Sequence, residues 1–89
     1  MKKIYKYILK LDVIQAVPIP GFVKILSVHN QKDTVNVWIE TDTALPEKTV
    51  NFHIYGTGNV INSNVELDFI GTVHLYDGEL VFHVFSEKG

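Results

Sequence analysis

Apolar and polar residues alternate with a period of two along most of this chain, which is the pattern of half-buried β-strands. Residues 5–11 place two tyrosines and two leucines on one face and two lysines on the other. β-Branched and aromatic residues dominate the alternating runs, and no apolar set recurs at helical spacing over three turns. Four later runs continue the alternation: 35–40, 50–55, 69–75 and 80–85.

This pattern predicts an all-β fold, a small antiparallel sandwich or barrel of six to seven strands with little or no helix. The alternative is one short helix near residues 63–68. Residues 13–21 contain Pro18 and Pro20, which donate no backbone hydrogen bond, so we expect an edge strand that ends in a turn. Residues 22–29 are apolar on both faces, which predicts a central strand.

The last third of the chain predicts the best-defined hairpin. Asp77-Gly78 favours a two-residue type I′ turn, because both central positions of that turn need a positive φ. An earlier polar break at residues 30–33 also has hairpin length. The Asp77-Gly78 turn fixes the register of four cross-strand pairs: Leu75 with Leu80, Val73 with Phe82, His74 with Val81, and Thr72 with His83.

The length, composition and net charge of the chain indicate one domain and argue against several classes of partner. With 89 residues, 46% of them hydrophobic and 20% charged, we expect one globular domain over residues 1–89. Eight lysines and no arginine stand against ten acidic residues, and a net charge of −2 argues against a nucleic-acid partner. Lys6 and Lys10 interrupt the N-terminal apolar run, so we predict neither a signal peptide nor a membrane partner but a cytoplasmic protein.

No motif for catalysis is recognisable. No serine lies in a nucleophile elbow, no pair of carboxylates has a useful spacing, and cysteine is absent. The predicted hairpin makes His74 and His83 diagonal neighbours on one face, but two histidines do not make a tetrahedral zinc site. Whether these two side chains meet stays open. We therefore expect a binding protein with no metal and no cofactor, not an enzyme.

The loop Gly56-Thr57-Gly58-Asn59 is the leading candidate for a binding site. Its two glycines allow successive N–H groups to line a concavity that holds a phosphate or carboxylate, and Thr57 and Asn59 add polar side chains. The loop lacks the Gly-Lys-Ser/Thr ending of a P-loop. The alternative is a tight corner between a strand and a loop, which glycines form more often.

Large aromatic residues on the face opposite the main apolar one form a second candidate. Trp38, Tyr55, Tyr76 and Phe85 fall there, which indicates that a loop, a second subunit or a planar ligand covers this face. With His53, the residues Trp38 and Tyr55 would stack on or hydrogen-bond a base. A small core without disulfides also favours a homo-oligomer.

Several segments together resemble a family of small bacteriophage proteins for which no catalytic residue is established. The resemblance covers nearly the whole chain and is most distinctive in three pieces: the Gly56-Thr57-Gly58 loop, the strand Phe69-Ile70-Gly71-Thr72 and the strand Leu80-Val81-Phe82-His83-Val84-Phe85. It implies a phage accessory protein that acts in the bacterial host cytoplasm by stoichiometric binding.

One strategy of such phage proteins is a homo-oligomer that sequesters a nucleotide-like anionic signal of host immunity. The glycine loop would hold the phosphate of that small ligand, and the aromatic residues would hold its base. The alternatives are an accessory protein that binds and blocks a host protein, and a structural component associated with the virion.

Overall fold

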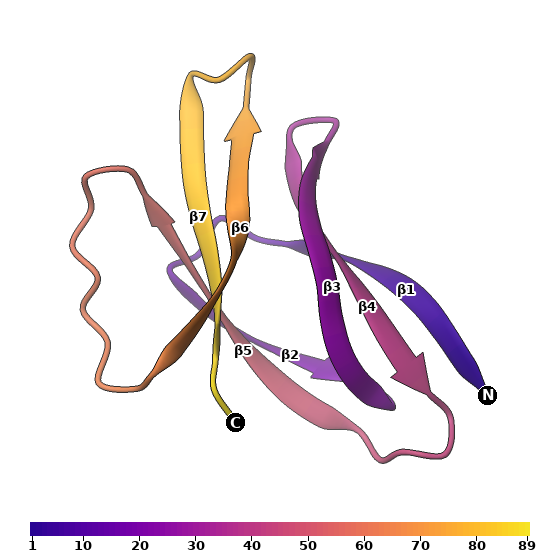
Figure 1. The fold of residues 1–89 in the computed structure, drawn as a ribbon. Helices are drawn as coiled ribbons and strands as arrows, with labels where there is room; N and C mark the ends of the chain where they lie inside the picture. Colours follow the sequence, from indigo (N-terminus) through magenta and orange to yellow (C-terminus); the bar gives the residue numbers. More distant parts are fainter.

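The computed structural model describes all 89 residues and consists of seven antiparallel β-strands without a helix (Figure 1). This confirms the all-β prediction, and residues 63–66 lie in a loop instead of the alternative short helix. The fold therefore has no helix that is long and apolar enough to cross a membrane. The strands are β1 (Lys2–Leu9), β2 (Ile14–Ile19), β3 (Phe22–Gln31), β4 (Thr34–Asp42), β5 (Lys48–Gly56), β6 (Leu67–Leu75) and β7 (Leu80–Glu87).

The strands form two sheets that pack as a sandwich. One sheet has the order β1-β4-β3 and the other the order β2-β5-β7-β6. The period-two pattern explains the packing, because Val35, Val37 and Ile39 of β4 turn inward while Trp38 turns outward. The centre of the core holds further side chains without exposed surface: Ile19, Phe52, Leu75 and Val84.

Two expectations about strand position have different outcomes. β2 is an edge strand that ends at a Pro20-Gly21 turn, as its prolines predict. β3 is not central, because it ends the order β1-β4-β3. Leu26 accordingly exposes 42% of its surface, whereas Val28 is buried where the free edge of β3 packs against β6 of the other sheet. A Cβ on Gly71 of β6 would lie 2.8 Å from Val28 Cγ1.

The C-terminal hairpin has the predicted register in all four pairs. Asp77 and Gly78 have φ values of 56° and 86°, and the N–H of Glu79 donates to the carbonyl of Tyr76 at 3.1 Å, as in a type I′ turn. The strand pairing ends at Leu75 and Leu80, however, so the loop has four residues, 76–79, instead of the predicted two. Tyr76 adds a third positive φ of 51°. The break predicted over residues 30–33 is shorter, since β3 and β4 pair up to a two-residue turn at 32–33.

The tips of the β3–β4 and β6–β7 hairpins lie side by side at the top of Figure 1 and are hydrogen-bonded to each other. The N–H of Tyr76 donates to Asp33 Oδ1 at 2.8 Å, and Asn30 Nδ2 donates to the carbonyl of His74 at 2.8 Å. We call this the joined end of the sandwich. At the other end, which we call the open end, the start of β3 (residues 22–26) and the start of β5 (48–51) border a cleft.

Candidate functional site

The glycine loop is a type II turn that starts the connection from β5 to β6. Gly58 has a φ of +87°, and a type II turn needs a positive φ at its third residue only. The N–H of Asn59 donates to the carbonyl of Gly56 at 3.1 Å and closes the turn. The N–H of Thr57 donates to the carbonyl of Val81 at 3.3 Å. Two of the three N–H groups from 57 to 59 are therefore engaged, and only that of Gly58 is left for a ligand.

His83 fixes this turn to the sheet. Its Nε2 lies 2.8 Å from Thr57 Oγ1 and its Nδ1 lies 2.9 Å from Thr72 Oγ1. The Thr57 hydroxyl that the sequence offered to a ligand thus joins β5 to the β6–β7 hairpin. His74 and His83 are diagonal on one face, as their register requires, but the ring nitrogens of His83 bind threonines. No group of three or more acidic or histidine side chains lies close enough to hold a metal ion.

His53 and Tyr55 belong to a buried hydrogen-bond network on the outer face of the four-stranded sheet. His53 Nε2 lies 2.7 Å from Glu87 Oε2, and His53 Nδ1 lies 2.9 Å from the Tyr55 hydroxyl. Asn51 Nδ2 donates to Glu87 Oε1 at 3.2 Å. The hydrogen bond from His53 holds the pKa of the Glu87 carboxyl below its usual value, with a smaller contribution from Asn51 against the cost of desolvation. Both ring nitrogens of His53 are thus committed within the fold.

Trp38 lies on the other sheet. It turns outward from β4, packs edge-to-face on His29 with ring centroids 5.8 Å apart, and stands opposite Lys6 of β1. The outer faces of two packed sheets point away from each other, so one chain does not bring Trp38 together with His53 or Tyr55. Phe85, in contrast, contacts Tyr55 at 5.9 Å and Phe69 at 5.4 Å between ring centroids. The predicted site residues therefore occupy three separate places.

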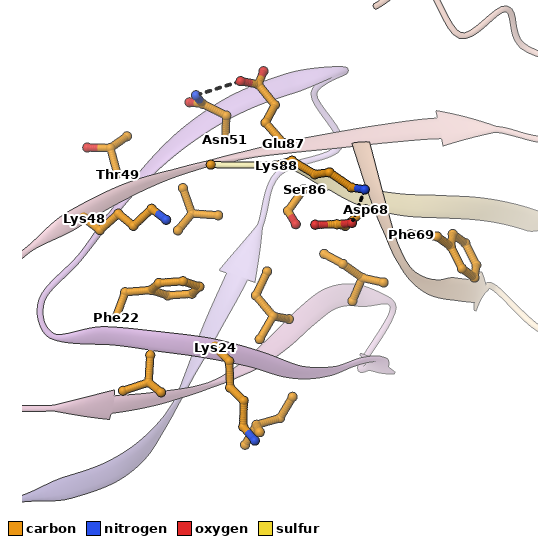
Figure 2. Close-up of a pocket in the computed structure, with 16 residues that line it drawn as sticks. Phe22, Lys24, Lys48, Thr49, Asn51, Asp68, Phe69, Ser86, Glu87 and Lys88 are labelled. Carbon is orange, nitrogen blue, oxygen red and sulfur yellow. Dashed lines mark hydrogen bonds and ion pairs between the residues drawn. The ribbon is translucent and has the colours of Figure 1, made fainter. Parts of the chain in front are cut away.

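The open end holds a cleft of about 600 Å³ that the sequence did not predict (Figure 2). Apolar side chains of β3, β5 and β6 line part of it: Phe22, Ile25, Val50 and Ile70. Figure 2 shows the ammonium group of Lys48 directed into the cleft from β5 and the Ser86 hydroxyl facing it from β7. Lys48 Nζ lies 5.3 Å from the centroid of the Phe22 ring, within the range of a cation–π contact.

Lys48 differs from the other lysines that line the cleft. Lys24 Nζ lies 3.9 Å from Glu40 Oε1, and Lys88 Nζ lies 3.6 Å from Asp68 Oδ1. No Asp or Glu carboxylate lies within 4.0 Å of Lys48 Nζ, which lies against the Phe22 ring and close to Gly89, where an added Cβ would stand 3.1 Å from it. The cleft thus combines apolar walls, a free cation and an acceptor carboxylate at Asp68.

One sequence signal could have located this cleft. Lys48 is in phase with Val50, Phe52 and Ile54, the inward-facing residues of β5, and Ser86 is in phase with Val84 of β7. Charged and polar residues at core-facing positions predict that the two sheets separate there, because an unpaired charge is costly to bury. The alternating run 50–55 in the sequence did not include Lys48, which is the first residue of β5.

Comparison with known proteins gives a family for the whole chain. The model of the family described as "Domain of unknown function (DUF7352)" matches residues 1–89. No curated protein and no solved structure matches the chain. The chain therefore belongs to this family.

Proposed function

We propose that this family member is a binding protein that captures a small anionic, nucleotide-like ligand in the cleft at the open end. The observation that carries the proposal is the Lys48 ammonium group, which has no carboxylate partner and points into a cleft of about 600 Å³ beside an aromatic ring. Clefts of about 300–1,000 Å³ with apolar walls and a few polar groups are typical of small-molecule sites.

The lining supplies a partner for each part of such a ligand. Lys48 would bind the phosphate as a point charge, since the chain has no arginine for a bidentate contact. Phe22, Ile25 and Ile70 would pack against the planar base. The Asp68 carboxylate would accept hydrogen bonds from sugar hydroxyl groups, because a carboxylate is an acceptor only.

The glycine turn is the rival location for the anion. It offers the Gly58 N–H and the Asn59 amide, beside a His83 whose ring is held by Thr57. On the resemblance to phage proteins, the captured anion would be a nucleotide signal of host immunity, and sequestration would require only stoichiometric binding.

Isothermal titration calorimetry with adenosine monophosphate and with a cyclic dinucleotide tests the proposal, with inorganic phosphate as the comparison ligand. We expect Lys48→Gln to weaken nucleotide binding at least tenfold. Lys24→Gln is the matched control, because Lys24 lines the same cleft but pairs with Glu40, and its affinity should stay within twofold. The absence of nucleotide binding by the unaltered protein would contradict the proposal.

Gly58→Val separates the two locations. The substitution strains a residue at φ +87°, while its side chain meets nothing within 4 Å, so the core stays intact. Loss of binding in Gly58→Val with retention in Lys48→Gln would assign the ligand to the turn instead of the cleft.

We also propose that the protein acts as a homo-oligomer. Apolar side chains of the β5–β6 connection support this, because Val60, Ile61 and Val65 expose 83%, 53% and 49% of their surface. Native mass spectrometry with and without nucleotide measures the subunit number and the ligand stoichiometry together. A bare monomer under both conditions would contradict the oligomer.

A further inference from the structure

The four edge strands of the two sheets differ in how they are protected. β2 has six residues with Pro18 among them, β3 has two register shifts and β6 has one. β3 and β6 also pack against each other. β1 has eight residues, no proline and an uninterrupted register with β4. It is therefore the one edge strand with neither a proline, a bulge nor a neighbouring strand over its free side, and such an edge is a template for another strand.

The backbone of β1 shows which of its groups are free. The carbonyl of Met1 accepts from the N–H of Thr43 at 3.1 Å, and the carbonyl of Lys3 accepts from the Thr41 hydroxyl at 3.2 Å. The backbone N–H and C=O groups of the odd-numbered residues of β1 are therefore directed towards β4. In an antiparallel pair the alternate residues direct their N–H and C=O groups away from the partner. The residues with free backbone groups are Lys2, Ile4, Lys6 and Ile8.

The side chains of these four residues alternate between charge and apolar surface. They share the outer face of the three-stranded sheet, where Ile4 and Ile8 expose 61% and 64% of their surface. Lys2 Nζ lies 3.7 Å from Glu40 Oε2, and Lys6 Nζ donates to the neutral Gln31 Oε1 at 2.7 Å. Lys6 thus keeps its whole positive charge, held in place by an uncharged partner.

Charge is also unevenly distributed along the chain. Residues 1–10 contain four of the eight lysines and none of the ten acidic residues, whereas the net charge of the chain is −2. Because like charges repel across a strand pair, two copies of β1 that met along this edge would bring their lysines together. A strand of opposite charge would gain from the same arrangement.

We propose that the free edge of β1 binds an extended acidic segment of a partner protein as an added strand. The backbone ladder would form with the free groups of residues 2, 4, 6 and 8, as in other cases of strand addition. On the outer face, acidic side chains of the segment would stand opposite Lys2 and Lys6, and apolar ones opposite Ile4 and Ile8. The partner is therefore recognised by acidic and apolar residues that alternate every second position.

Fluorescence anisotropy with a labelled eight-residue peptide tests this proposal. The peptide carries glutamate and valine alternately on one face and threonine on the other, and its matched control carries lysine in place of glutamate. We expect the acidic peptide to bind at least tenfold more tightly than the control. Lys6→Glu should reverse that preference, whereas Lys10→Glu, the same charge change beyond the end of β1, should alter the affinity less than threefold.

Ile4→Pro tests the backbone ladder. It removes an N–H that faces the free edge, so the β1–β4 pairing is preserved and peptide affinity should fall at least tenfold. Circular dichroism checks that the sheet is intact. Lys6→Glu remains decisive if Ile4→Pro does not fold, because it changes an exposed side chain whose one hydrogen bond is to the exposed Gln31 and leaves the backbone of β1 intact.

Three outcomes would overturn the proposal. Equal affinity for both peptides would contradict recognition of the partner by its acidic residues. An unchanged affinity in Lys6→Glu would show that the peptide does not bind along the outer face of β1. If native mass spectrometry shows a dimer that Ile4→Pro abolishes, the free edge of β1 pairs with a second copy of this chain instead of an acidic segment. Lys48→Gln should leave peptide affinity unchanged, so failure here is separate from failure of the nucleotide proposal.

Discussion

The joined end and the open end of the sandwich differ in that polar side chains enter the core-facing positions of β5 and β7 only at the open end. Towards the joined end, β4 and β6 direct Val35, Val73 and Leu75 inward, and Asp33 and Asn30 close the tips through hydrogen bonds. Towards the open end, Lys48 and Ser86 stand at inward-facing positions beside apolar side chains such as Val50, and the sheets border a cleft there.

Under the proposed function, this difference separates stability from binding within one short chain. Apolar side chains gain free energy by leaving water, so they draw the two sheets together. Charged groups such as Lys48 and Asp68 lose hydration when buried, so they keep the sheets apart. Substitutions near the joined end should therefore change the free energy of unfolding, and substitutions at the open end should change ligand affinity.

The largest effect is expected at the line of contact between β3 and β6. Gly71→Ala would place a Cβ 2.8 Å from Cγ1 of the buried Val28, so either the Val28 side chain or the two strands would have to shift. We expect a loss of about 1–3 kcal/mol, the usual cost of overpacking a core. Urea denaturation followed by circular dichroism measures it.

A double-mutant cycle shows whether this contact is the cause. Val28→Ala removes the methyl group that Gly71→Ala would meet, so Gly71→Ala should cost much less in that background. Additive losses from the two substitutions would contradict close packing between β3 and β6.

A smaller effect is expected from Asp33→Gly at the joined end. Glycine adopts the φ of 60° without strain, so the substitution removes only the acceptor of the Tyr76 N–H. We expect a loss of about 1 kcal/mol in the free energy of unfolding, typical of one hydrogen bond. Asp33→Asn keeps an acceptor oxygen and is the control. Hydrogen exchange at the Tyr76 amide should accelerate in Asp33→Gly but not in Asp33→Asn. Equal exchange rates in the two variants would contradict a stabilising hydrogen bond between the two tips.

The alternation of apolar and polar residues was sufficient to predict the strands, but not to predict their order in the sheets. Local spacing and turn chemistry specify a hairpin, which is why the register from Thr72 to His83 was correct. The place of β3 in its sheet depends on contacts with β6, more than 40 residues away in the chain, and no pattern within residues 22–29 contains that information.

The candidate site shows the same limit. The glycines were expected to free successive N–H groups for an anion, but that depends on contacts distant in the chain, since the N–H of Thr57 donates to the carbonyl of Val81. His53 was expected to stack on or hydrogen-bond a base, whereas in the fold its ring nitrogens contact Glu87 and Tyr55. Lys48 in phase with core residues was a visible signal, and it lies beside the cleft.

The contact between His53 and Glu87 should make stability depend on pH. The pKa of Glu87 in the folded protein is below the value of about 4.5 expected when the chain is unfolded. The stabilisation is therefore present above pH 4.5 and is lost as the pH falls through the folded-state pKa. Urea midpoints measured between pH 3 and 7 should fall less steeply on acidification in Glu87→Gln than in the unaltered protein. Parallel curves would contradict a role for this carboxylate.

The smallest effect on stability, with the opposite sign, is expected from Lys48→Leu at the open end. Leucine continues the inward phase of Val50 and Phe52, adds apolar surface towards Phe22 and removes a charge that has no carboxylate partner. We expect a gain of up to about 1 kcal/mol in the free energy of unfolding together with the loss of nucleotide binding, because a site that binds a charged ligand is less stable without that ligand than an apolar core.

Lys24→Leu provides the contrast for that prediction, because Lys24 lies at the same cleft but its charge is paired with Glu40. It adds a comparable apolar side chain outside the inward phase, so neither stability nor nucleotide affinity should increase. Thermal denaturation and calorimetry on both variants compare them directly. If Lys48→Leu were destabilising by as much as Asp33→Gly, Lys48 would support the fold, and the division between a stabilising end and a binding end would be wrong.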